Sequence, residues 1–261
     1  MRILYILSFL FLFNKASAQN KPLATLQFDK LYHAGINPAG ELFTLSDKKI
    51  NRFDKDGKIA HEINFTNATA VTQFDAWHLT QLVLYYRNTQ TIEFYNPILD
   101  LRNSFVIDSV FAIEPEWVAA SFDQQHFWIF DKADKSIKKV NYKTQEVVVD
   151  EAVQVISNQE SVKGMREYQR FLFVHTSAAL HVFSAMGRHI KTVSIKPNQS
   201  FDFFGEELVI LEEDQLLMSS LFTNDNRKVS AFSTFDKVFL TDERLFGIRK
   251  DRIEIFEFNP Q

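Results

Sequence analysis

The sequence contains no cysteine and little glycine or proline: its 261 residues include seven glycines and six prolines. Without cysteine the chain can form no disulfide, zinc–thiolate site or thiol nucleophile, and we expect no lipid anchor on an N-terminal cysteine. Neither a glycine-rich phosphate loop nor the Gly-x-Ser-x-Gly motif of serine hydrolases is present. These absences remove several large classes of enzyme.

An excess of basic residues is also missing. The chain has 29 Lys and Arg residues against 33 Asp and Glu residues, which gives a formal net charge of −4. Proteins that bind nucleic acid usually carry a basic patch or stripe that neutralises phosphates. A mildly acidic chain without a basic run therefore predicts no nucleic-acid partner.

Long apolar runs are rare, and the N-terminal one has the features of an export signal. Arg2 is followed by the apolar stretch Ile3 to Phe13 and then by Ala16-Ser17-Ala18. This order of charge, apolar stretch and small-x-small site is typical of a secretory signal peptide. A helix of that length spans roughly 16 Å, about half of a bilayer's hydrocarbon core. We predict a signal peptide over residues 1–18, an exported domain over residues 19–261, and no transmembrane anchor.

No catalytic or metal-binding constellation stands out. None of the seven histidines forms a His-Glu-x-x-His pair. His175 and His181 fall in successive predicted strands, where ordinary structural imidazoles are the favoured interpretation. The acidic clusters at residues 206–207 and 212–214 are better read as solvated turn charges than as a calcium site. We therefore predict no catalytic, cofactor-binding or metal-binding residues.

What the sequence does contain is a repeat with a period near forty residues. Each unit has an apolar strand, a polar turn, a second strand that ends in a large apolar residue, another turn and a third strand. The clearest copy runs from Glu41 to Phe65, with Gly57 in its second turn. The apolar residues that mark the units recur at intervals of about 36 to 45 residues, and they are Phe53, Tyr95, Val140, Phe183, Phe222 and Phe258.

A further strand fits ahead of the units, as at residues 71–74, 117–120, 201–203 and 238–240. Units of four short strands with this period are the signature of a β-propeller. The 27 phenylalanines fit that architecture as core residues between packed sheets. We therefore predict an all-β fold, a six-bladed β-propeller.

The two ends of the chain predict how the ring closes. The sixth unit lacks its last strand, because only three residues follow Phe258. An unpaired strand, Ala24 to Phe28, precedes the first unit and matches the missing strand in type and length. Pairing of the two would leave no long sheet edge exposed. We predict that the N-terminal strand closes the last blade.

Two blades carry a resemblance to a known family. Gly40 to Thr44 followed by Lys49 to Lys58 resembles a blade of the NHL-type six-bladed propellers, and the segment Phe183 to Arg188 is similar. The resemblance implies the fold, but propellers host hydrolases, lyases and scaffolds, so it implies no single activity. The signal sequence and the Phe-, Lys- and Asn-rich composition resemble exported proteins of the Bacteroidota.

Two connections between units are the candidate docking sites. Ile107 to Trp117 combines aromatic and acidic residues, and Asp150 to Arg170 is the longest connection and mixes both charges. Equivalent junctions of a propeller share one face, and protein partners favour aromatic anchors ringed by charge. An added strand over residues 153–156 is the alternative for the second connection. The predicted binding residues are Phe111, Glu114, Glu116, Trp117, Lys163 and Arg166. We expect the two aromatic rings among them to be exposed.

Two functional hypotheses follow. The first is a non-enzymatic binding module or scaffold in the periplasm or outer envelope, with another envelope protein as partner and no cofactor. The second is a lactonase-like propeller hydrolase with a metal at the central channel. The segments expected to line that channel are largely apolar and offer few ligands beyond Asp202. A metal site needs three or four convergent ligands, which favours the first hypothesis.

Overall fold

A computed structural model of the chain describes residues 21–259 except 197–198, 224 and 232. The predicted signal peptide over residues 1–18 lies outside the described residues. Within them the regular structure is β-strand, apart from one short 3₁₀ helix at Ala68–Ala70. No helix in this part of the chain is long and apolar enough to cross a membrane.

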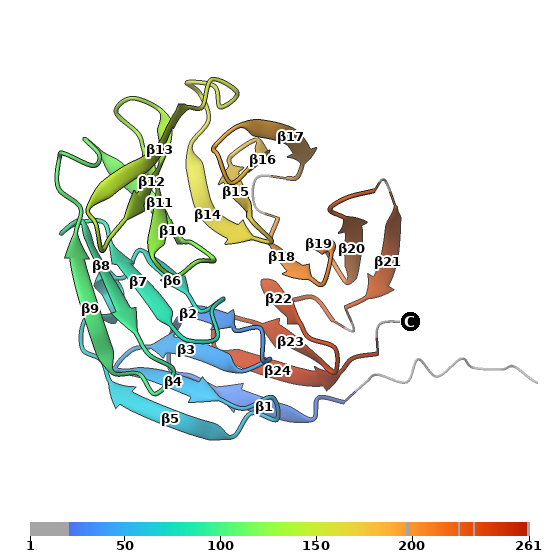
Figure 1. The fold of residues 1–261 in the computed structure, drawn as a ribbon. Coiled ribbons are helices and arrows are strands. Elements are labelled where there is room, and N and C mark those ends of the chain that lie inside the picture. Colours follow the sequence, from blue (N-terminus) through green and yellow to red (C-terminus); the bar gives the residue numbers. More distant parts are fainter. Residues whose placement is uncertain (1–20, 197–198, 224, 232, 260–261) are drawn as a thin grey trace, which may run out of the picture.

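Six antiparallel sheets of four strands follow one another around a central axis, as Figure 1 shows. The closest backbone approaches between neighbouring sheets are those of their first strands, so these strands surround the axis. This arrangement confirms the predicted six-bladed propeller.

From the axis outward, the first blade is β2 (Leu31–Ile36), β3 (Leu42–Ser46), β4 (Lys49–Phe53) and β5 (Ile59–Asn64). The second is β6 (Gln73–Asp75), β7 (Leu82–Tyr86), β8 (Thr91–Tyr95) and β9 (Leu101–Val106).

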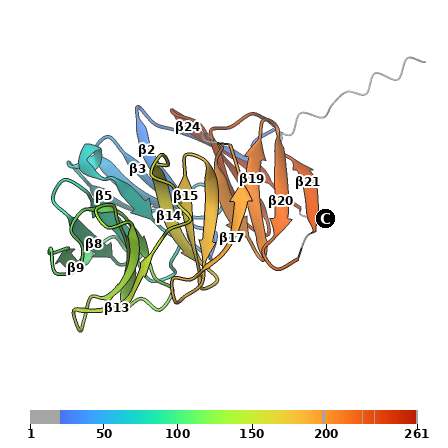
Figure 2. The same cartoon turned by 90° about the horizontal axis from the view of Figure 1, so that it is seen from above.

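The next three blades repeat this order. The third is β10 (Pro115–Ala120), β11 (His126–Asp131), β12 (Ser136–Asn141) and β13 (Glu146–Ala152). The fourth is β14 (Val162–Tyr168), β15 (Phe171–Thr176), β16 (Ala179–Phe183) and β17 (His189–Ser194). The fifth is β18 (Phe201–Phe204), β19 (Glu207–Glu212), β20 (Gln215–Ser220) and β21 (Asn226–Ser230). Turned by 90° in Figure 2, the fourth and fifth blades stand side by side.

The sixth blade joins both ends of the chain. It consists of β22 (Lys237–Leu240), β23 (Arg244–Ile248), β24 (Arg252–Glu257) and β1 (Ala24–Gln27). β1 pairs antiparallel with β24, from Ala24 opposite Ile255 to Gln27 opposite Arg252. Leu26 also packs against the core between the sixth and first blades. The predicted closure by the N-terminal strand is confirmed.

The hydrophobic core lies between neighbouring blades rather than inside any one of them. Tyr85 and Phe94 of the second blade, for example, share a cluster with Phe127 and Ile129 of the third. Middle strands are covered on both faces, and every residue of β7 is buried. Such strands appear in the sequence as continuous apolar runs, which is why the repeat was visible there.

Two predicted segments are wrong. The connection from residue 150 to 170 is not a long loop, because β13 runs to Ala152 and β14 occupies Val162–Tyr168. Only residues 153–161 connect them. The marker residue of the fifth unit, Phe222, was expected to end a strand. β20 ends at Ser220 instead, and Phe222 lies beyond it, 56% exposed. β14 was missed because its charged residues face a polar channel and a polar blade junction, so its apolar alternation is weak.

All six innermost strands begin at one face of the ring and end at the other. The cavity at one mouth of the channel is lined by strand starts such as Gln73, Lys163 and Lys237. The cavity at the other mouth is lined by strand ends such as Phe204 and Leu240. We term the first the front face and the second the rear face. The connections 107–114 and 153–161 therefore both lie on the front face.

Candidate functional site: a cavity in the channel mouth

A cavity of about 540 Å³ occupies the channel at the front face. Ligand sites in proteins are concave, largely apolar and fitted with a few polar groups, which makes this cavity the candidate site. Its wall takes residues from the innermost strand of every blade, so it exists only because the ring is closed. One residue from each of these six strands is Gly35, Gln73, Trp117, Met165, Phe201 and Phe239.

Positive charge dominates the wall. Lys163, Arg166 and Lys237 line the cavity, whereas Asp75 is the only carboxylate of its wall among the described residues. Arg166 forms an ion pair with Asp202 of β18, whose side chain is buried. The ammonium groups of the two lysines have no hydrogen bond or ion pair within the described part of the chain. The cavity therefore presents unpaired cations.

Trp77 packs against Arg166, one of the residues that line this cavity. The indole lies 4.8 Å from the guanidinium of Arg166 and 5.2 Å from the ring of Tyr168. Although Trp77 follows β6 of the second blade, it packs against the cores of blades four and five and of blades six and one. It thus reaches across the axis. It lines a rear cavity of about 290 Å³.

Desolvation lowers the pKa of the histidines around the channel. It is the largest cause for His33, His78 and His175. A hydrogen bond to the carbonyl of Val71 opposes the lowering at His33, and the charge of Lys163 adds to it at His175. With pKa values lowered from 6.5, these imidazoles are neutral at pH 7.

The pKa of Lys237 is lowered as well. Withdrawal of the ammonium from bulk water is the largest cause; Asp202 and Asp75 oppose it, and Arg166 adds to it. The ammonium lies 4.5 Å from the centre of the Phe239 ring, which attracts a cation only weakly compared with a carboxylate partner.

The expectation of a largely apolar channel is wrong, because Asp75, Arg166 and Lys237 line its front cavity. Asp202, the expected ligand, is buried and pairs with Arg166. Within the described ranges, no three His, Asp or Glu side chains are grouped as a metal ion would require. One oxygen of Asp202 binds Arg166, and Oδ2 has no hydrogen-bond partner. His181 is remote from the channel and contacts Glu160 and Thr192 in the fourth blade.

Three of the six predicted docking residues meet in the structure: Trp117, Lys163 and Arg166 all line the cavity. The ring of Trp117 is half-buried rather than projecting from the face. Its Nε1–H donates to the carbonyl of Val162, at 3.0 Å, and the guanidinium of Arg87 lies 4.8 Å from the ring. Trp117 therefore forms part of the channel wall between the third and fourth blades.

The other three lie apart. Phe111 is 9% exposed and belongs to the core between blades two and three, so the prediction that its ring is exposed is wrong. The carboxylate of Asp131 accepts the backbone N–H groups of Ile113 and Glu114, which folds this connection onto the sheet. Glu114 is exposed beside Lys132. Glu116 is half-buried on β10, and its carbonyl accepts a hydrogen bond from Arg87.

Exposed apolar residues of the same connection were overlooked in the sequence. Val110 is 79% exposed and Ile113 is 72% exposed. Both lie on the front face, beside the start of β10. Their signal in the sequence was the run Val110 to Ile113, in which apolar residues do not alternate with polar ones. Phe111 and Ala112 fill the core, and their two neighbours point to solvent.

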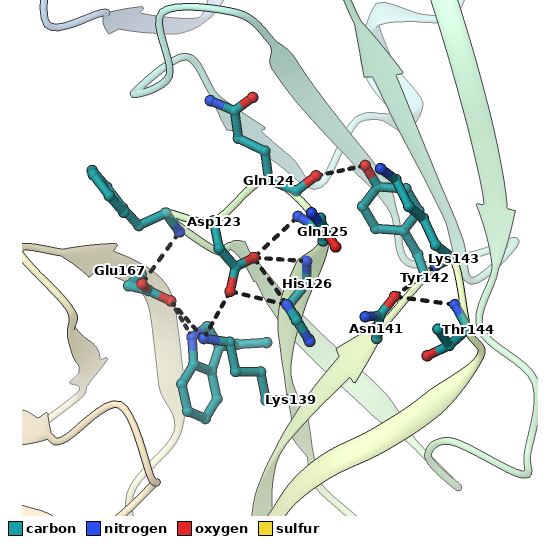
Figure 3. A network of polar contacts seen from close by, with 12 residues as sticks. Asp123, Gln124, Gln125, His126, Lys139, Asn141, Tyr142, Lys143, Thr144 and Glu167 are labelled. Atoms are coloured by element: carbon teal, nitrogen blue, oxygen red, sulfur yellow. Dashed lines mark hydrogen bonds and ion pairs between the residues drawn. The ribbon is translucent and has the colours of Figure 1, made fainter.

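A polar network joins blades three and four beside the channel (Figure 3). The carboxylate of Glu167 accepts the indole N–H of Trp128 and, at 3.2 Å, the backbone N–H of Phe122. The ammonium of Lys139 lies 3.8 Å from Glu167 and 3.6 Å from Asp123. Sequence reasoning missed Glu167, because it placed this residue in a loop.

No family model and no curated protein matches the sequence. Solved structures do match in fold. The WD40 domain of Pan2 from Neurospora crassa is 7% identical, with a TM-score of 0.59, over 92% of this chain and 96% of that one. Virginiamycin B lyase from Staphylococcus aureus is 12% identical, with a TM-score of 0.55, over 87% and 80%. BamB from Moraxella catarrhalis is 8% identical, with a TM-score of 0.50, over 92% and 100%. At these identities the likeness shows the propeller fold alone.

Proposed function

We propose that this protein is an exported, non-enzymatic binding propeller of the cell envelope that engages its partner at the front face. The observation that carries the proposal is the front cavity, whose wall contains Trp117 and two lysines without hydrogen-bond or ion-pair partners in the described residues. Proteins pair the charges that they withdraw from water, since an unpaired charge costs free energy. Lys237 is such a charge, because burial is the largest cause of its lowered pKa, and we infer that it is retained for a ligand rather than for the fold.

The surface around the cavity supports a protein partner. Val110 and Ile113 stand exposed on the front face, and Lys163 lies at the cavity mouth. Apolar contacts beside charged groups are the composition that interfaces use. The proposed partner is another envelope protein, and the relation to NHL-type propellers and the Bacteroidota remains a prediction from the sequence.

The geometry favours binding over metal-dependent hydrolysis. Hydrolysis at the channel would need carboxylates or imidazoles that converge on one point. The channel carboxylate Asp202 instead binds Arg166, and Asp75 accepts the backbone N–H of Trp77 at 3.0 Å. Propellers occur both as the lyase and as the WD40 domain named above, so the fold itself does not decide between the classes.

A face-selective capture experiment tests the proposal. Mature protein is immobilised and exposed to detergent extract of the host envelope, and captured proteins are identified by mass spectrometry. The front-face variant combines Val110→Asp and Ile113→Asp, and the matched rear-face control combines Leu79→Asp and Met186→Asp, all at exposed positions. We expect the front-face variant to lose a partner that the control retains. Equal capture by both variants contradicts the proposal.

A further inference from the structure

The lining of the front cavity selects one class of ligand. We infer that the cavity binds the carboxylate of a small organic molecule with an apolar body, and that Lys237 is the residue that takes the carboxylate. This inference rests on the proposed use of the front face for binding, and it names the chemistry of what enters the cavity.

Lys237 is the inner cation that remains free. It stands at the start of β22, and its side chain lines the cavity. Arg166, the other inner cation, is paired with Asp202 and covered by Trp77. Lys163 is exposed, so it can attract an anion to the mouth but does not withdraw it from water. A carboxylate inside the cavity therefore finds its charge-assisted hydrogen bond at Lys237.

Three buried polar atoms of the wall residues lack partners. The hydroxyl of Ser200, Nε2 of His175 and Nε of Arg166 have no hydrogen bond within the described residues. Buried polar atoms are normally satisfied, and those that are not call for an explanation. A ligand with polar atoms near its carboxylate would supply partners for these atoms. The amide of Gln73, by contrast, is already engaged with Met165 and Val118.

The size and the apolar wall define the rest of the ligand. A volume of about 540 Å³ admits a molecule of moderate size. The half-buried rings of Trp117 and Phe201 contribute aromatic surface from two different blades, against which an apolar or aromatic body can pack.

The same lining disfavours a phosphate. Phosphate groups carry more charge than a carboxylate and are bound by several donors, often a bidentate arginine. Here the arginine is occupied by Asp202, and the carboxylate of Asp75 lies in the wall. Lys237, the one inner cation without an ion pair, near the carboxylate of Asp75, suits a ligand with a single negative charge.

Protonation of Lys237 links binding to pH. Burial lowers its pKa, and the charged and titratable groups around it are Asp75, Asp202, Arg166 and His33. A bound carboxylate stabilises the charged ammonium and raises that pKa again. Affinity for a carboxylate therefore falls as the pH rises through the lowered pKa, at a lower pH than an exposed lysine would give.

Titration calorimetry with N-benzoylglycine, against its neutral amide, tests the inference on the mature protein. We expect the acid to bind, and the amide to bind at least about tenfold more weakly, the loss expected for one charge-assisted hydrogen bond. Lys237→Met should lower the affinity for the acid by the same factor, whereas Lys237→Arg should retain most of the affinity of the wild type. Lys143→Met, at an exposed position outside the cavity, should leave it unchanged.

Two more pairs of ligands identify the source of the carboxylate. A phenylalanine-containing dipeptide is compared with its C-terminal amide, and octanoate with octanamide; the acid that binds more tightly indicates a peptide or a fatty acid. The inference is wrong if none of the three acids binds, if acid and amide bind alike, or if Lys237→Met retains the affinity of the wild type. Partner capture that survives Lys237→Met while no acid binds would overturn the inference and leave the proposed function standing.

Discussion

Two regions of this propeller withdraw charged side chains from water. They differ in whether those side chains have hydrogen-bond or ion-pair partners. At the junction of blades three and four, both oxygens of Glu167 accept hydrogen bonds, and Lys139 lies nearby. In the front cavity, Lys237 has no such partner in the described part of the chain. The junction therefore has the pairing that stability requires, and the cavity has the unpaired group that a ligand requires.

The two regions are separated by a single step along β14. Arg166 lines the cavity, and Glu167, the next residue, binds blade three. Successive side chains of a strand point to opposite faces, so one strand serves both the channel and the junction. Charged side chains at neighbouring positions thus serve the channel wall and the blade junction.

The largest loss of unfolding free energy is expected from Glu167→Ala, which removes the central acceptor of the junction between blades three and four. The change leaves the indole N–H of Trp128 and the backbone N–H of Phe122 without acceptors, and removes the anion beside Lys139. Removal of one partner from a buried charged network costs about 3–5 kcal/mol. Urea unfolding of the variant measures the loss. The matched control is Glu114→Ala at an exposed ion pair with Lys132, for which the change should stay within about 1 kcal/mol. Similar losses in both variants would contradict a structural role for the network.

A second prediction tests paired charge elsewhere in blade four. Burial opposes ionisation of Glu160, but hydrogen bonds from Thr176, Ser157 and His181 prevail and lower its pKa to about 2 from 4.5. Because the folded-state pKa is lowered, the stabilisation is present above pH 4.5 and disappears as the pH falls towards 2. Glu160→Gln should lose about 2 kcal/mol at pH 7 and show less acid sensitivity than the wild type over that window. Parallel pH profiles of stability would show that the pairing contributes nothing.

A smaller effect is expected from Trp117→Phe, at the boundary of the two regions. The variant keeps an aromatic ring in the cavity wall but removes the hydrogen bond from Nε1 to the carbonyl of Val162. The expected loss of unfolding free energy is about 1 kcal/mol, the usual worth of one such bond. Thermal unfolding followed by circular dichroism measures it. A loss as large as that of Glu167→Ala would place Trp117 in the structural network instead of the cavity.

The smallest effect, and the one of opposite sign, is expected from Lys237→Met. The lowered pKa of Lys237 means that its charged form is less favourable in the folded chain than in the unfolded one. Below the lowered pKa this costs stability, and the cost disappears as the pH rises towards the unfolded value. The neutral side chain should therefore leave stability unchanged or raise it by less than about 1 kcal/mol. A clear destabilisation would mean that Lys237 supports the fold.

The propeller could be predicted from the sequence because its middle strands are covered on both faces. Strands such as β7 and β11 are nearly free of exposed residues and appear as apolar runs at a regular period. The ends of the chain predicted the closure of the sixth blade for a similar reason, since an apolar strand without a partner has to find one. β14 escaped detection because Lys163, Arg166 and Glu167 interrupt its apolar residues.

The candidate site could be predicted only in part. Trp117, Lys163 and Arg166 were singled out from composition, and the structure brings them to one cavity. Lys237 was missed, because nothing near it in the sequence distinguishes this lysine from those in exposed turns. Phe111 was misassigned because an aromatic residue in a connection can equally pack inward, and Asp131 holds this connection against the sheet.

By itself, the sequence determined the class of fold, the number of blades and the strand that closes the ring, because these depend on period and on local apolar pattern. Only the tertiary structure decided which side chains meet at the axis. Gln73, Trp117, Arg166 and Lys237 belong to four different blades and are far apart along the chain. Their proximity follows from ring closure, which places the start of every innermost strand at one mouth, and the local pattern of residues carries no information about it.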